Sequence, residues 1–185
     1  MGTKRIAIGT GPHTPRGVSL LELVIVLAVV AIVAAAAAPS FTALIDARRL
    51  ESAATRLAAD LQLVRSEAMA RQRPLRLSVL AGTDASCWIV HTGAAADCRC
   101  GEEAGATCTA PARLIKGVAL PARERVGVAG NVASIVFDPL HGTSTPTGTL
   151  RLVAADGRSV RHVVNVVGRV RSCSPEGAVP GYPIC

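Results

Sequence analysis

The chain begins with a polar, basic stretch and then changes to an unbroken apolar run. Residues 1–17 contain three basic residues and no acidic one, whereas all sixteen residues of Leu23–Ala38 are apolar. The segment Val18–Ala38 would form about 31 Å of α-helix, enough to cross a bilayer once. Because basic flanks stay on the cytoplasmic side, we expect the rest of the chain to lie on the other side of the membrane.

Beyond Pro39 the apolar residues recur at spacings of three and four, which is typical of one face of an α-helix. This stripe consists of Leu50, Ala54, Leu57, Leu61, Val64 and Ala68. Pro39 is expected to bend the helix rather than end it, because the pattern resumes at once. Pro74 is expected to end it. The charges between these positions are interpreted as a solvated face.

After Pro74 the pattern changes to the alternation typical of β-strands. Strands are predicted at 75–80, 87–91, 125–128, 133–137, 149–153 and 159–167, with turns at 81–84, 138–148 and 156–157 and a loop at 94–109. One long helix followed by a run of strands predicts an α+β fold, with an antiparallel sheet packed on the helix. The predicted divisions are a leader (1–17), a membrane-spanning helix (18–38), its continuation (39–73) and a β-rich domain (74–185).

Six cysteines follow the apolar run, and an even number in an exported domain indicates disulfides. We expect Cys173 to pair with Cys185, because this bond would staple a proline-rich tail. The other four are expected to pair among themselves, in a pattern the sequence leaves open: Cys87, Cys98, Cys100 and Cys108. No metal site is expected, because the chain has no Cys-x-x-Cys and no histidine at ligand spacing.

Basic charge is concentrated towards the C-terminus. The whole chain has 20 basic and 13 acidic residues, a net charge of +7; without residues 1–17 the net charge is +4. Residues 151–171 alone hold five arginines and one aspartate, and arginine suits bidentate contact with phosphate. No histidine has a nucleophile context and no glycine-rich phosphate loop is present, so neither an enzyme nor a cofactor is expected.

The N-terminal boundary resembles the cleavage motif of type IV prepilins. It reads Arg16-Gly17-Val18, with Glu22 at the fifth place after the glycine and the apolar run following. The resemblance implies that a prepilin peptidase cuts after Gly17 and methylates Val18, where the family usually has Phe. It also implies that Glu22, costly to bury in lipid, meets the N-terminal amine of a neighbouring subunit during assembly. A secretory signal peptide with its cleavage site at 34–38 is the alternative.

Two further segments are similar to the FimT and GspH branch of pilins. They are the helix 57–73 and the stretch from Ile135-Val136-Phe137-Asp138-Pro139 to Gly168-Arg169-Val170-Arg171. The resemblance implies a type IV pilin fold and a single-pass inner-membrane protein with a periplasmic domain, which later joins a pilus or pseudopilus. The implied partners are major and minor pilins, the prepilin peptidase and the inner membrane.

In FimT-like minor pilins a Gly-Arg-x-Arg motif is associated with DNA binding during natural transformation. The resemblance therefore implies that Gly168, Arg169 and Arg171 contact double-stranded DNA, and the charge pattern alone suggests that Arg158 and Arg161 extend the patch. The glycine would let the backbone approach DNA closely. Such contacts would be independent of DNA sequence and sensitive to salt.

Other interpretations of the same residues stay open. The arginines could cap the sheet or pair with acidic residues. The chain could instead be an H-type minor pseudopilin of a type II secretion system, a structural subunit. An unrelated membrane-anchored binding domain is the third possibility, against which the combination of Gly17 and Glu22 weighs.

Overall fold

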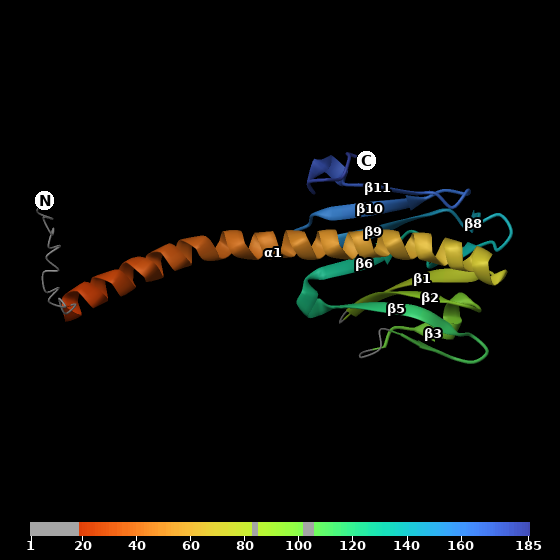
Figure 1. Cartoon of the computed structure of the whole chain (residues 1–185), viewed down its shortest axis with the longest axis horizontal. Coiled ribbons are helices and arrows are strands. Elements are labelled where there is room, and N and C mark those ends of the chain that lie inside the picture. Colours follow the sequence, from red (N-terminus) through yellow and green to blue (C-terminus); the bar gives the residue numbers. More distant parts are fainter. Residues whose placement is uncertain (1–18, 83–84, 102–105) are drawn as a thin grey trace, which may run out of the picture. The chain divides into compact units, whose positions relative to one another are not determined.

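The computed structural model describes residues 19–82, 85–101 and 106–185 (Figure 1). The chain divides into two compact units, one ending at Ser40 and the other running from Phe41 to Cys185. The helix α1, Leu20–Arg71, contributes residues to both units and continues through position 39, as the sequence pattern predicted. Gly17, Val18 and the rest of the leader lie outside the described residues.

The first part of α1 has the character of a membrane-spanning helix. Ser19 precedes the helix, and its hydroxyl accepts a hydrogen bond from the Glu22 amide at 3.2 Å, which caps the first turn. The large apolar side chains between Leu20 and Val33 are all more than half exposed. Within the described residues, α1 is the one helix long and apolar enough to cross a membrane, with a mean hydropathy of 2.9 over 18 residues.

The second part of α1 belongs to the core of the unit that starts at Phe41. Every residue of the predicted apolar stripe is buried, and Ala53 joins it. The helix ends at Arg71, three residues before Pro74, and Gln72 adopts a left-handed conformation with φ of 52°. The helical spacing of the sequence therefore predicted the buried face correctly.

Two antiparallel sheets and a short hairpin make up the rest of this unit. The five-stranded sheet has the order β5-β2-β1-β7-β8, with bounds Leu114–Pro121, Ala85–His91, Leu75–Ala81, Ser134–Phe137 and Ser144–Thr145. The four-stranded sheet has the order β11-β10-β9-β6, with bounds Val170–Cys173, Ser159–Val164, Gly148–Ala154 and Val126–Gly130. The hairpin pairs β3 (Cys98–Arg99) with β4 (Thr107–Cys108), and short 3-10 helices occupy Ala95–Asp97, Ala122–Glu124 and Pro175–Gly177.

One hydrophobic core joins α1 to both sheets. Within the second unit α1 lies across strands of both sheets (Figure 1), and its buried stripe packs with inner residues such as Trp88, Ile135 and Leu152. Asp60, on α1, is a buried acid beside the core residue Trp88. The Asp60 carboxylate accepts hydrogen bonds from Trp88 Nε1 at 2.7 Å and from Lys116 Nζ at 2.5 Å, so its buried charge is compensated.

The structure differs from the predicted strands in three places. β5, β11 and the two-residue strands β3, β4 and β8 were not predicted, β10 ends at Val164 rather than at 167, and the strands form two main sheets rather than one. Gly117 and Pro121 obscured the alternation of β5; this strand lies at a sheet edge, where proline is tolerated. Residues 165–168 form a turn, which explains the early end of β10.

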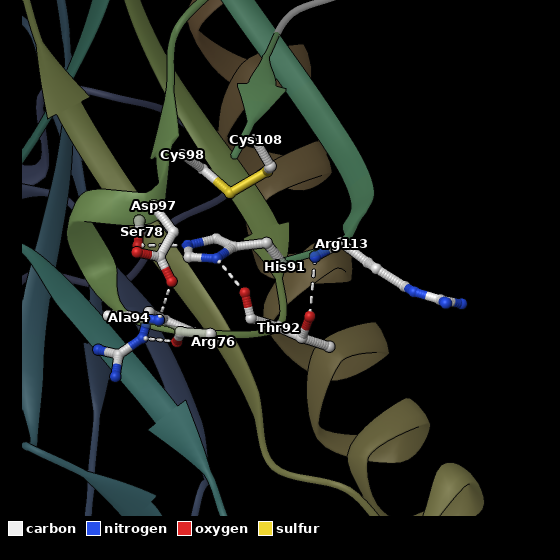
Figure 2. The surroundings of a disulfide bond; sticks show 10 residues. Arg76, Ser78, His91, Thr92, Ala94, Asp97, Cys98, Cys108 and Arg113 are labelled. Atoms are coloured by element: carbon white, nitrogen blue, oxygen red, sulfur yellow. Dashed lines mark hydrogen bonds between the residues drawn. A yellow bond between two sulfur atoms is a disulfide. The ribbon is translucent and has the colours of Figure 1, made fainter. Parts of the chain in front are cut away.

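The six cysteines form three disulfides. Cys173 pairs with Cys185, as expected, and the four cysteines of the central region pair as Cys87–Cys100 and Cys98–Cys108. Figure 2 shows the Cys98–Cys108 bond, which joins β3 to β4. Among the described residues no group of three potential ligands could hold a metal ion.

Candidate nucleic-acid interface

The turn between β10 and β11 carries the Gly-Arg-x-Arg motif. The Gly168 amide donates to the Asn165 carbonyl at 2.9 Å, and the Arg169 amide donates to Asn165 Oδ1 at 2.9 Å. Gly168 has a φ of +72°, a left-handed conformation in which glycine is favoured. The side chain and carbonyl of Asn165 thus fix the backbone from which Arg169 projects.

Gly168 is buried, and the close approach that it allows is to the protein itself. A Cβ at this position would collide with the Gly142 carbonyl oxygen and would lie 3.1 Å from Arg65 Nε. Arg65, on α1, donates from Nε to the same Gly142 carbonyl at 3.0 Å. The glycine of the motif therefore docks the turn onto α1 and onto the loop that follows β7, rather than lying open to a ligand.

The strand register gathers arginines on one face of the four-stranded sheet. Arg161 on β10 stands directly opposite Arg151 on β9, and Arg171 on β11 stands opposite Val163. Residues of one parity on a strand share a face. The alternate residues Leu150, Leu152 and His162 are buried, so the arginines lie on the other side of the sheet.

We call this surface the arginine face: Arg151, Arg161 and Arg171 on the strands, with Arg169 exposed two positions before Arg171. Within the described part of the chain, none of the four side chains makes an ion pair or a hydrogen bond. A hollow lies between the first two and is also lined by Asn131 and Thr149. The surface therefore presents four arginines without a partner among the described residues, and two of them, Arg151 and Arg161, line a shallow depression.

Arg158 is not part of this surface. Its guanidinium makes an ion pair with Asp156, with Nη2 2.5 Å from Oδ2, and Nη2 also donates to the Ala43 carbonyl of α1 at 3.0 Å. The Arg158 hydrogen bond holds the pKa of Asp156 below its usual range. The charge pattern suggested that Arg158 extends the patch; its neutralised charge and its contact with the helix assign it to the protein's own structure.

Arg151 was not singled out from the sequence as a site residue. Its place opposite Arg161 depends on which residues of β9 and β10 pair. The sequence shows that both residues lie on predicted strands, but the pairing register is a long-range property. The alternation of apolar and polar residues could have placed Arg151 and Arg161 each on the exposed side of its own strand. It could not have shown that the two residues lie opposite one another.

Two histidines, His91 and His162, are fully buried. His91 Nε2 lies 2.8 Å from Ser78 Oγ, and Nδ1 lies 2.9 Å from the Thr92 carbonyl (Figure 2). The carbonyl requires a proton on Nδ1, so Nε2 accepts from the Ser78 hydroxyl. Burial lowers the pKa of His91. Both side chains of this serine–histidine pair are buried, which keeps a substrate away from it.

His162 lies on the inner face of β10. Its Nδ1 is 2.8 Å from Ser172 Oγ, whereas Nε2 has no hydrogen-bond partner among the described residues. Burial lowers the pKa of His162 to about 4. The ring is therefore neutral at pH 7 and belongs to the core between the four-stranded sheet and the rest of the unit.

Comparison with family models gives two matches. The model described as type II transport protein GspH matches residues 53–168, and the model of the prokaryotic N-terminal methylation motif matches residues 13–38. A search of curated proteins found no significant match.

The chain is similar to solved structures of a minor pilin and of a minor pseudopilin. The type IV minor pilin FimU of Pseudomonas aeruginosa is 23% identical and covers 70% of this chain and 94% of its own, with a TM-score of 0.48. The minor pseudopilin EpsH from the type 2 secretion system of Vibrio cholerae is 12% identical and covers 69% of this chain and 98% of its own, with a TM-score of 0.46.

Proposed function

The chain belongs to the family of the type II transport protein GspH, and from that premise we propose that it is a minor type IV pilin that binds double-stranded DNA for uptake. The observation that supports this proposal most strongly is the arginine face. Four arginines gather there without an acidic partner among the described residues. A polyanion is the ligand that such a surface fits.

The cost of this surface to the fold supports a binding role. Like charges directly opposite on neighbouring strands destabilise a sheet, and Arg151 and Arg161 stand in this relation. A duplex would place phosphates along the face and remove the repulsion. Because guanidinium groups would contact phosphate rather than base edges, the binding would fix the position of the DNA without reading its sequence.

The N-terminal segment supports assembly into a filament. The methylation-motif match covers residues 13–38, so we propose cleavage after Gly17 and methylation of Val18 by a prepilin peptidase. Glu22 lies in the exposed first turn of α1. In an assembled filament its carboxylate would pair with the N-terminal amine of a neighbouring pilin, because each charge alone is costly in lipid. The basic leader would stay cytoplasmic and the second unit would be periplasmic.

DNA binding can be tested on the full-length chain in a neutral detergent. Fluorescence anisotropy with a labelled duplex would compare the wild type with Arg169→Gln plus Arg171→Gln. The matched control is Arg56→Gln plus Arg123→Gln, which also removes two exposed arginines whose side chains have no partner among the described residues. We expect the first variant to lose about tenfold or more in affinity and the control to stay near the wild type, because only the first removes phosphate contacts.

A wild type that does not bind duplex DNA at low salt would contradict the proposal. Equal losses in the two variants would also contradict it, because they would show that net charge rather than the arginine face determines affinity.

The second candidate function is that of an H-type minor pseudopilin, and the match of residues 53–168 to type II transport protein GspH favours it. In this role the arginines would contact other pilins or exported proteins. Deleting the gene in its host and measuring both transformation frequency and the yield of secreted proteins separates the two. The DNA-uptake proposal predicts a loss of transformation with unchanged secretion, and the pseudopilin alternative predicts the reverse.

A further inference from the structure

A second group of arginines lines a groove beside α1. The groove has a volume of about 720 Å³ and is formed by one side of the helix together with the end of β5 and the 3-10 helix Ala122–Glu124. Its basic lining residues are Arg48, Arg49, Arg56 and Arg123, and its one acidic lining residue is Glu124. This volume lies in the range of small-molecule sites.

The chemistry of the helical wall changes along its length. Leu44 and Ile45, which line the groove, are 53% and 44% exposed, and Phe41 one turn earlier is 65% exposed. The next turns of the same face carry Arg48, Arg49 and Arg56. Spacings of three and four place all of these residues on one stripe of α1. The groove is therefore apolar at the end that comes first in the chain and cationic further on.

The positive charge of the groove is largely uncompensated. Arg49 Nη1 donates to the backbone carbonyls of Arg123 and Glu124, at 3.4 and 3.5 Å, which leaves its charge unpaired. The side chains of Arg56 and Arg123 have no ion pair or hydrogen bond within the described ranges. Among the described residues Arg48 alone of the four has a carboxylate partner, Glu51, which lies 2.9 Å away.

We propose that this groove binds an anionic phospholipid, with the phosphate at the arginines and an acyl chain against Leu44 and Ile45. The order of chemistry along the chain carries this assignment. Leu44 comes six residues after Ala38, the end of the predicted span, and the arginines follow it. A phospholipid has the same order, since its phosphate lies outside its acyl chains. Arginine also matches phosphate geometry through bidentate hydrogen bonds.

The apolar end distinguishes a lipid from nucleic acid. Duplex DNA offers phosphates but no apolar segment, so it would leave Leu44 and Ile45 exposed. A phospholipid covers both ends of the groove. The lipid would orient the second unit at the membrane surface before the subunit leaves the membrane for a filament. This proposal uses residues outside the arginine face and does not depend on DNA binding.

Native mass spectrometry of the full-length chain in neutral detergent tests the proposal. Phosphatidylglycerol and phosphatidylcholine with identical acyl chains would be titrated separately, and the lipid-bound fraction measured. We expect the wild type to prefer phosphatidylglycerol by about tenfold, since each arginine at a membrane surface contributes a several-fold gain. Arg56→Gln plus Arg123→Gln should lower this preference at least about fivefold.

Two further variants make the result specific. Arg151→Gln plus Arg171→Gln removes the same charge from the arginine face and should leave the lipid preference unchanged. Glu124→Gln removes the one acidic lining residue and should raise the affinity for phosphatidylglycerol.

Three results would overturn the proposal. The first is equal binding of the two lipids by the wild type. This result would show that the groove does not select an anionic lipid and would favour another ligand, such as an acidic segment of a neighbouring subunit. The second is an equal loss of preference in the two double variants. The third is a loss of duplex affinity in Arg56→Gln plus Arg123→Gln that matches the loss on mutating Arg169 and Arg171, which would assign the groove to DNA.

Discussion

At the scale of single residues, Gly168 shows how a motif residue can act through the fold. Its left-handed backbone and its contact with Gly142 and Arg65 hold the β10–β11 turn against α1. Arg169 and Arg171 follow directly, so the direction in which they project depends on this docking. In the proposed interface Gly168 is a positioning residue and the arginines are the contact residues.

Gly168→Ala should therefore destabilise the second unit. A Cβ would collide with the Gly142 carbonyl and strain a left-handed backbone, at a cost of roughly 2–3 kcal/mol in the free energy of unfolding. Gly157→Ala is the matched control, because Gly157 has a φ of +89° but no neighbour within 4 Å of its Cβ position. The control should lose only about 1 kcal/mol. Urea unfolding followed by the fluorescence of Trp88, the one tryptophan of the chain, measures both.

Equal losses in the two glycine variants would contradict this account of Gly168, because they would show that backbone strain alone determines the cost.

His162 makes the stability of the second unit depend on pH. Burial lowers its pKa to about 4 from the usual 6.5. Between these values the unfolded chain binds the proton more readily, so the free energy of unfolding falls as the pH falls from 6.5 to 4. The loss attributable to this residue amounts to roughly 3 kcal/mol. Burial also lowers the pKa of His91, so this residue adds to the loss of stability as the pH falls.

The test is urea unfolding of the wild type and His162→Gln at several pH values between 7 and 4. The variant should lose less stability across this range, because it lacks the buried imidazole. A wild-type slope that His162→Gln leaves unchanged would show that the buried imidazole does not titrate as described.

At the scale of elements, the periodicity of the sequence predicted the long helix and most of the longer strands, but not how the strands pair. The helix stripe and the strands containing Leu77, Trp88, Ile135 and Leu152 were recovered because their alternation or helical spacing is complete within a few residues. β5 was missed because Gly117 and Pro121 interrupt its pattern, and the division into two sheets depends on pairings between distant segments. The family match at residues 53–168 covers the same part of the chain.

The C-terminal tail depends on the Cys173–Cys185 bond. The buried residues of the tail are Ser174 and Val179. The end of the tail lies beside Ser174, whose amide donates to the Pro183 carbonyl and whose carbonyl accepts from the Cys185 amide. Replacing both cysteines by serine removes a cross-link over 12 residues and should lower the free energy of unfolding by about 2–3 kcal/mol. Urea unfolding under non-reducing conditions measures the change. An unchanged midpoint would show that the tail holds without the bond.

At the scale of the whole molecule, two arginine surfaces serve different proposed ligands. The arginine face lies on the four-stranded sheet, and the groove lies between α1 and the end of β5. The motif Gly168-Arg169-Val170-Arg171 was recognisable from the sequence. The sequence could not show that Arg151 belongs to the arginine face, because its place there depends on strand register. It also could not show that Arg158 lies outside this face, because that depends on contacts with Asp156 and with Ala43, which is distant in the sequence.

The salt dependence of DNA binding tests the central claim most directly. Affinity of the full-length chain for a duplex would be measured across a salt series, for the wild type and for a variant with all four arginines of the arginine face changed to glutamine. If each arginine neutralises one phosphate, the wild-type plot of log K against log salt has a slope of about −3.6, and the variant retains little affinity and little salt dependence. An unchanged slope and affinity in the variant would contradict the claim.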